Sequence, residues 1–121
     1  MMSVARDPSP RTLVLTADDT LRAAFAKLLQ TRGHRLEFAA ELALAPTQGL
    51  RLVVVDDRCV PPLIPFGALF DDPDTVVMAV TGDEALAAAL LARGAMDFLL
   101  RPFSAAGLAA RLDAVERKMA L

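Results

Sequence analysis

The chain has no tryptophan and no tyrosine, and only one of its 121 residues is a cysteine, Cys59. A lone cysteine excludes a disulfide-stapled fold and agrees with a reducing, cytoplasmic compartment. Without these aromatic residues or a basic run, and with a net charge of -2, the chain lacks the features of a nucleic-acid binder. No apolar run approaches the roughly 20 residues that span a bilayer. We therefore expect a cytoplasmic protein that contacts neither nucleic acid nor membrane.

Length and composition indicate one domain. Residues 1–10 contain charges and prolines but no apolar centre, which is typical of a flexible tail and not of a signal peptide. No internal repeat or interdomain linker is visible in the rest of the chain. Residues 11–121 are long enough to bury a core without disulfides or metal, and we interpret them as a single domain.

Apolar segments alternate with helical patterns along this domain. Runs rich in Val and Leu predict buried strands, and the alternation of residues 35–39 predicts a strand near a sheet edge. The expected strands are residues 12–16, 35–39, 52–55, 75–80 and 96–100. The first expected helix begins at Asp18 and Asp19, ends at Gly33 and has an apolar stripe formed by Leu21, Phe25, Leu28 and Leu29. Shorter helices are expected over residues 41–45, 66–70 and 83–93. The last begins at Ser104, and its apolar stripe consists of Leu108, Leu112, Val115 and Met119.

This alternation predicts an α/β fold in which helices cover both faces of a doubly wound, five-stranded parallel sheet. The second and third helices of the (βα)5 order should be short, because proline and glycine interrupt residues 46–49 and prolines recur over residues 61–65. In such sheets, sites form beyond the carboxyl ends of the strands. The residues at those ends are 16–19, 56–58, 81–82 and 101–102.

An aspartate ends the predicted central strand, a hydroxyl ends the next, and a cation precedes a proline on the last. Residues 52–56, 77–82 and 94–103 in this order resemble the receiver domain of two-component response regulators, a flavodoxin-like fold, and the resemblance extends from Arg11 to Leu121. It implies Asp56 as the phosphoacceptor, Thr81 and Phe98 as switch residues, and a phosphate-contact position at Arg101 and Pro102, with a cis bond before Pro102.

The resemblance also implies a histidine-kinase or acyl-phosphate donor and Mg²⁺ as cofactor. Its ligands would be Asp18, Asp56 and the backbone carbonyl of Arg58. Thr16 and Ala17, however, occupy the positions of the family's acidic pair. Mg²⁺ prefers several carboxylate oxygens in an octahedron, so we expect it to bind poorly.

Two further departures affect the same region. Arg101 replaces the family's lysine, and an arginine is longer, planar and forked, so the exchange is not conservative at a tight phosphate site. Val60 replaces the family's proline four residues after the phosphoacceptor. Together with the missing acidic pair, these changes favour an atypical pseudo-receiver.

Several candidate residues also have purely structural interpretations. Asp56 can pair with Arg101, because a guanidinium can replace a metal electrostatically. Asp18 can cap a helix and Asp19 can favour its dipole, while the hydroxyl of Thr81 can bond the following turn and Asp83 can cap the next helix. A single cysteine such as Cys59 is typical core filler, and His34 has no second histidine with which to share a metal, so we expect it at the surface.

Three functions remain open. The first is a pseudo-receiver, not an enzyme, that acts as an interaction or dimerisation module. The alanine-rich helix at residues 83–93 lets another backbone approach and, with residues up to 121, matches the family's output face. The second is a working phosphoacceptor that a histidine kinase phosphorylates on Asp56. The third is a small flavodoxin-like cofactor binder, which the absence of a glycine-rich loop after the first strand disfavours.

Overall fold

The computed structural model describes residues 9–70 and 72–119, so most of the tail expected over residues 1–10 lies outside the described residues. Within them, one sheet contains five parallel strands in the order β2-β1-β3-β4-β5. The strands are β1 (Arg11–Leu15), β2 (Arg35–Ala39), β3 (Leu52–Asp56), β4 (Val76–Thr81) and β5 (Asp97–Leu100). The doubly wound sheet is confirmed, as are the edge position of residues 35–39 and the central position of residues 52–55.

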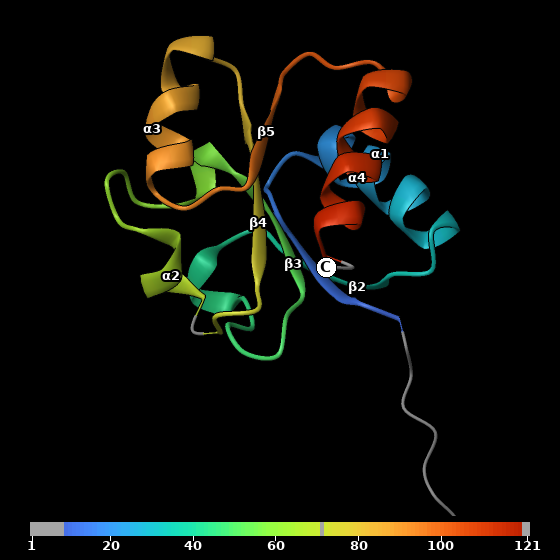
Figure 1. Ribbon diagram of the computed structural model, residues 1–121, viewed down its shortest axis with the longest axis horizontal. Coiled ribbons are helices and arrows are strands. Elements are labelled where there is room, and N and C mark those ends of the chain that lie inside the picture. Colours follow the sequence, from blue (N-terminus) through green and yellow to red (C-terminus); the bar gives the residue numbers. More distant parts are fainter. Residues whose placement is uncertain (1–8, 71, 120–121) are drawn as a thin grey trace, which may run out of the picture.

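Helices cover both faces of this sheet. The α-helices of the described part are α1 (Asp19–Thr31), α2 (Phe66–Leu69), α3 (Ala87–Ala92) and α4 (Ala105–Met119). Helices α1 and α4 lie on one side of the sheet, and α2 and α3 lie on the other (Figure 1). No helix in residues 9–70 and 72–119 is long and apolar enough to cross a bilayer.

Two buried clusters fill the space between the sheet and its helices. Under α1 and α4, the core consists of Val14, Leu21, Phe25, Leu29, Leu52, Val54, Met78, Val80, Leu99, Leu108, Leu112 and Val115. On the opposite face it consists of Leu13, Leu15, Ala39, Leu50, Val53, Val55, Val60, Phe66, Phe70, Val77, Ala79, Leu90 and Ala95. Adjacent strand residues alternate between these sets, because successive side chains point to opposite faces.

The middle helices are short, as predicted. The second crossover contains a three-residue 3-10 turn, η1 (Leu42–Leu44), and no α-helix. The third contains the 3-10 turn η2 (Asp57–Cys59) and, after the prolines, the short helix α2. The helix expected over residues 83–93 opens as a 3-10 turn, η3 (Glu84–Leu86), before α3 begins. Gly33 follows α1 and Gly94 follows α3, and both have positive φ angles. A residue with a Cβ would be strained at these positions.

Helix α1 has the predicted phase. Asp18 caps it by accepting hydrogen bonds from the backbone N–H groups of Thr20 and Leu21 at 2.9 and 3.2 Å. Leu21, Phe25 and Leu29 are buried against the sheet. The inward stripe therefore begins at Leu21, which leaves Thr16 and Ala17, and not Asp18 and Asp19, at the two positions directly after β1.

The prediction that His34 lies at the surface is wrong. Its side chain is fully buried, and its two ring nitrogens lie 2.7 Å from Oγ1 of Thr12 and 3.0 Å from a carboxylate oxygen of Glu116. Glu116 also pairs with Arg32. Thr12 of β1 and Glu116 of α4 are thus the polar partners that satisfy the buried ring.

Candidate functional site

The carboxyl ends of β1, β3, β4 and β5 bring together the polar residues that the sequence singled out. Asp56 is the last residue of β3 and Thr81 the last of β4, and these adjacent strands are parallel. Thr16 follows β1, and Arg101 follows β5. We call Thr16, Asp56, Asp57, Arg58, Thr81 and Arg101 the strand-end cluster.

Asp56 lies at the centre of this cluster and is fully buried. Its Oδ1 accepts hydrogen bonds from the backbone N–H and Nε of Arg58 at 3.1 and 2.9 Å, and from Nη1 of Arg101 at 2.8 Å. Its Oδ2 accepts from the hydroxyl of Thr16 and from Nη2 of Arg58, both at 2.8 Å. Burial alone would raise the pKa of Asp56, but the donors from Arg58, Thr16 and Arg101 hold it far below its ordinary value of 3.8.

Arg58 contributes more than its backbone to this site. Asp56 caps the 3-10 turn η2 (Asp57–Cys59), and this bend returns the Arg58 guanidinium to the Asp56 carboxylate as a two-pronged fork. Nη2 also lies 3.4 Å from Oδ2 of Asp18. The bond to Asp56 raises the pKa of Arg58 above its ordinary value, so the side chain stays charged.

Sequence reasoning considered only the backbone carbonyl of Arg58 and missed its side chain. The available signal was an arginine two residues after a carboxylate that ends a buried strand, because a turn there can fold the side chain back.

Arg101 joins Asp56 to Thr81 through Asp57. Its Nη1 donates to Asp56, and its Nη2 donates to Oδ1 of Asp57 at 3.1 Å. The hydroxyl of Thr81 donates to Oδ2 of the same Asp57 carboxylate at 2.6 Å, and Thr81 is fully buried. The predicted pairing of Asp56 with Arg101 is present. Asp57 lies within the strand-end range 56–58 that the sequence predicted, but the sequence assigned it no role.

Three other residues that the sequence singled out are Phe98, Pro102 and Cys59. Phe98, a half-buried residue of β5, lies under the guanidinium of Arg111, whose Cζ is 5.5 Å from the ring centroid. The peptide bond before Pro102 is cis, as the resemblance implied. Cys59 is half-buried and packs against the core, and burial raises the pKa of its thiol, which agrees with its interpretation as core filler.

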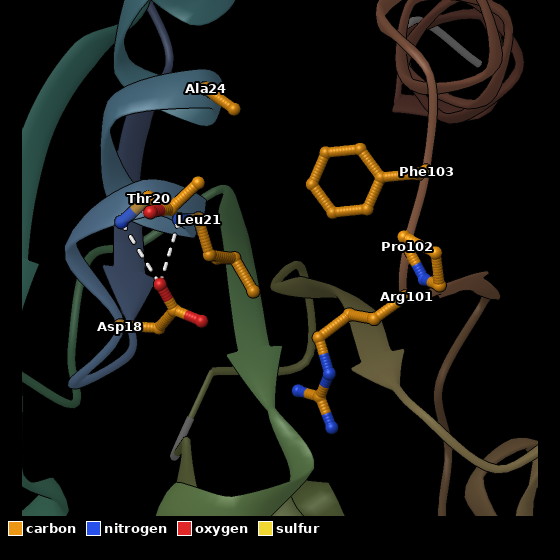
Figure 2. Close-up of a pocket in the computed structure, with 7 residues that line it drawn as sticks. All are labelled: Asp18, Thr20, Leu21, Ala24, Arg101, Pro102 and Phe103. Atoms are coloured by element: carbon orange, nitrogen blue, oxygen red, sulfur yellow. Dashed lines mark hydrogen bonds between the residues drawn. The ribbon is translucent and has the colours of Figure 1, made fainter.

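A pocket of about 480 Å³ lies beside the cluster, between the start of α1 and the segment after β5. Figure 2 shows Arg101, Pro102 and Phe103 across this space from Asp18, with the ring of Phe103 pointing toward α1. The residues around this space are Asp18, Thr20, Leu21, Ala24, Arg101, Pro102 and Phe103. Its wall is largely apolar away from Asp18 and Arg101.

The residues at this edge do not fit Mg²⁺. Both oxygens of Asp56 already accept hydrogen bonds from guanidinium groups or from Thr16. In residues 9–70 and 72–119, no three His, Cys, Asp or Glu side chains form a group that could hold a metal ion. Mg²⁺ requires oxygen ligands at about 2.1 Å, and here arginine nitrogens take those directions.

No protein-family model and no curated protein matches the chain. Similar solved structures include NtrX from Brucella abortus in complex with ATP, with 24% identity and a TM-score of 0.74 over 92% of this chain and 28% of that chain. The chemotaxis response regulator CheY4 of Vibrio cholerae shares 18% identity at a TM-score of 0.66, over 88% of this chain and 98% of that one.

A two-component response regulator from Clostridium difficile is also similar, with 14% identity and a TM-score of 0.72 over 92% of this chain and 98% of that chain. This chain therefore spans under a third of NtrX, but nearly all of the two shorter proteins. At these identities the likeness shows the fold. The chain has the flavodoxin-like α/β fold of response-regulator receiver domains.

Proposed function

We propose that this chain is a receiver-like signalling domain of a two-component phosphorelay that works through protein contacts, with Asp56 held in an unphosphorylated state. One observation carries the proposal: Asp56 is fully buried, and both of its oxygens are engaged by internal donors. A nucleophilic carboxylate must reach the phosphoryl donor with a free oxygen. The arginine contacts at Asp56 oppose that approach.

Phosphorylation tests this proposal directly. The whole chain is incubated with acetyl phosphate and Mg²⁺, and separately with beryllium fluoride and Mg²⁺, while amide spectra follow Asp56, Thr81 and Phe98. We expect no aspartyl phosphate and an unchanged spectrum. The variant Asp56→Asn is the matched control. Phosphate incorporated by the wild type and not by this variant would refute the proposal.

The second candidate is the working phosphoacceptor. The position of Asp56 and Thr81 at the ends of adjacent parallel strands favours it, because this arrangement lets a modified carboxylate reach the switch hydroxyl. The side chain of Arg58 is 53% exposed, so it can leave Asp56 without disturbing the core. The same phosphorylation experiment decides between the two candidates.

For the partner, we propose a second copy of the chain, bound through the α3 face, which we define as the exposed residues Ala85, Leu86, Ala88, Leu91 and Ala92. Leu86 and Leu91 are 43% and 42% exposed. Asp83 and Glu84 stand at one end of this segment and Arg93 at the other. Two copies packed antiparallel would bring opposite charges together while small alanines allow close approach.

Sedimentation over a range of concentrations tests the dimer. We expect reversible association of the wild type and a monomer for Leu91→Asp. Leu44 is 75% exposed in η1, at the other end of the sheet order, so Leu44→Asp is the matched control and should associate like the wild type. A wild type that stays monomeric at every concentration would contradict the proposed interface.

A further inference from the structure

Three polar groups of one residue, Arg58, bind the buried carboxylate of Asp56. The backbone N–H and Nε reach Oδ1, and Nη2 reaches Oδ2. Arg101 supplies a single donor to the same carboxylate and turns its other nitrogen to Asp57. Arg58 is therefore the cation that encloses Asp56.

The same guanidinium bridges two carboxylates. Nη2 of Arg58 lies 2.8 Å from Oδ2 of Asp56 and 3.4 Å from Oδ2 of Asp18. Asp18, Asp56 and Asp57 carry three negative charges, and Arg58 and Arg101 carry two positive charges. Without Arg58, a buried carboxylate, its neighbour Asp18 and the hydroxyl oxygen of Thr16 would border one space, and these are oxygen ligands of the kind that Mg²⁺ takes.

Exposure distinguishes the two arginines. The side chain of Arg101 is 19% exposed and is held by two carboxylates, whereas that of Arg58 is 53% exposed and approaches Asp56 from the solvent. Removing Arg58 would therefore open Asp56 to water, while removing Arg101 would leave the solvent side closed. A planar guanidinium fork also satisfies both carboxylate oxygens at once, which a hydrated ion could match only after losing water.

We propose that the Arg58 guanidinium is a built-in counter-ion that takes the place of a divalent cation at Asp56 and excludes it. The proposal goes beyond the missing acidic residues, since it assigns the exclusion to one side chain. It rests on the proposed function only in that both concern Asp56, and metal binding is measured without any phosphoryl donor.

The test is a titration with Mg²⁺ alone, up to about 10 mM, the range of weak metal sites. Wild type, Arg58→Asn and Arg58→Lys are compared by the amide shifts of residues 16–18 and 56–58 and by the thermal midpoint. We expect no saturable change in the wild type up to about 10 mM Mg²⁺. Arg58→Asn should bind saturably, with a midpoint roughly tenfold or more below that limit. Arg58→Lys keeps a charge but loses the fork, so it should fall between the two.

Two controls test whether Mg²⁺ binding depends on Arg58 and Asp56 in particular. Arg22 is an exposed arginine that pairs with Asp19 on α1, so Arg22→Asn removes the same charge elsewhere and should leave Mg²⁺ binding absent. The double variant Arg58→Asn with Asp56→Asn should lose the binding that the single variant gained. Amide spectra without Mg²⁺ show whether each variant is folded, and if Arg58→Asn does not fold, Arg58→Lys against the wild type decides.

Two results would overturn the inference, and they differ in what they mean for the proposed function. Saturable Mg²⁺ binding at Asp56 in the wild type would refute the counter-ion role and would also favour the working phosphoacceptor. If neither the wild type nor a folded Arg58→Asn variant binds Mg²⁺, only the role of Arg58 is refuted. In that second case, the unphosphorylated state of Asp56 would stand on Arg101 and the missing acidic pair.

Discussion

Replacing Asp56 with asparagine should destabilise this protein. Asparagine has the shape of aspartate but carries no charge and only one acceptor oxygen. Because Arg58 and Arg101 both donate to the carboxylate, the change removes two charge-assisted contacts, and the new NH₂ group faces a donor. In a cluster of carboxylates without internal cations, the same change would relieve repulsion and raise stability. The sign of the effect therefore reports whether the arginines neutralise the site.

The magnitude follows from the burial of Asp56. Removing one partner of a buried ion pair costs about 3–5 kcal/mol. The lower end applies, because Arg58 is half exposed and can regain water, and Arg101 keeps its contact with Asp57. We expect Asp56→Asn to lower the free energy of unfolding by about 3 kcal/mol at pH 7, which shifts the urea midpoint by roughly 2 M.

The pH dependence provides a second check. The pKa of Asp56 is lowered in the folded state from 3.8, so its contribution to stability is complete above that value and is lost as the pH falls toward the folded-state pKa. The stability difference between wild type and Asp56→Asn should therefore be constant from about pH 5 to 8 and should shrink below about pH 4. The lowered pKa of Glu37, which pairs with Arg11 away from this cluster, affects both proteins alike and cancels.

Asp19→Asn is the matched control, since the side chain of Asp19 is 89% exposed and pairs with a half-exposed arginine. It should change the free energy of unfolding by less than about 0.5 kcal/mol. The reasoning would be refuted if Asp56→Asn were as stable as the wild type, or more stable, in urea at pH 7.

Three further outcomes are expected. His34→Ala should lower the free energy of unfolding by about 2–3 kcal/mol in urea, because it leaves a cavity and an unmet hydroxyl on Thr12; a loss below about 0.5 kcal/mol would contradict the buried network. Arg101→Lys should cost about 1–2 kcal/mol, since lysine lacks the fork whose two nitrogens bond Asp56 and Asp57 separately; an unchanged midpoint would argue against the bridge. Cys59 should react with iodoacetamide more slowly at pH 8 than a free thiol, because burial raises its pKa; equal rates measured by mass spectrometry would contradict its burial.

Much of the fold follows from local patterns. The continuous apolar run at residues 52–55 predicts a strand buried on both faces, and β3 lies at the centre of the sheet. The spacing of Leu21, Phe25 and Leu29 predicts the buried face of α1, and Asp18 caps that helix. These features depend on side-chain periodicity and backbone capping, which operate within a few residues of each other.

The candidate site was only partly predictable. Asp56, Thr81 and Arg101 follow from their positions at strand ends, because parallel strands present their carboxyl ends at one edge. The link from Thr81 to Asp57 and the fork of Arg58 on Asp56 did not follow. Both depend on rotamers that the sequence pattern does not specify.

The sequence by itself determined which segments become strands and helices, which faces they bury, and which edge of the sheet carries the charged residues. Only the tertiary structure decided that His34 is buried, since its partner Glu116 lies 82 residues away along the chain. The sequence allowed Asp56 to pair with Arg101, but only the tertiary structure decided that Arg58 joins Arg101 on that carboxylate. The physical reason is that periodicity acts locally, whereas burial and ion pairing depend on the distances that packing creates between segments remote in the sequence.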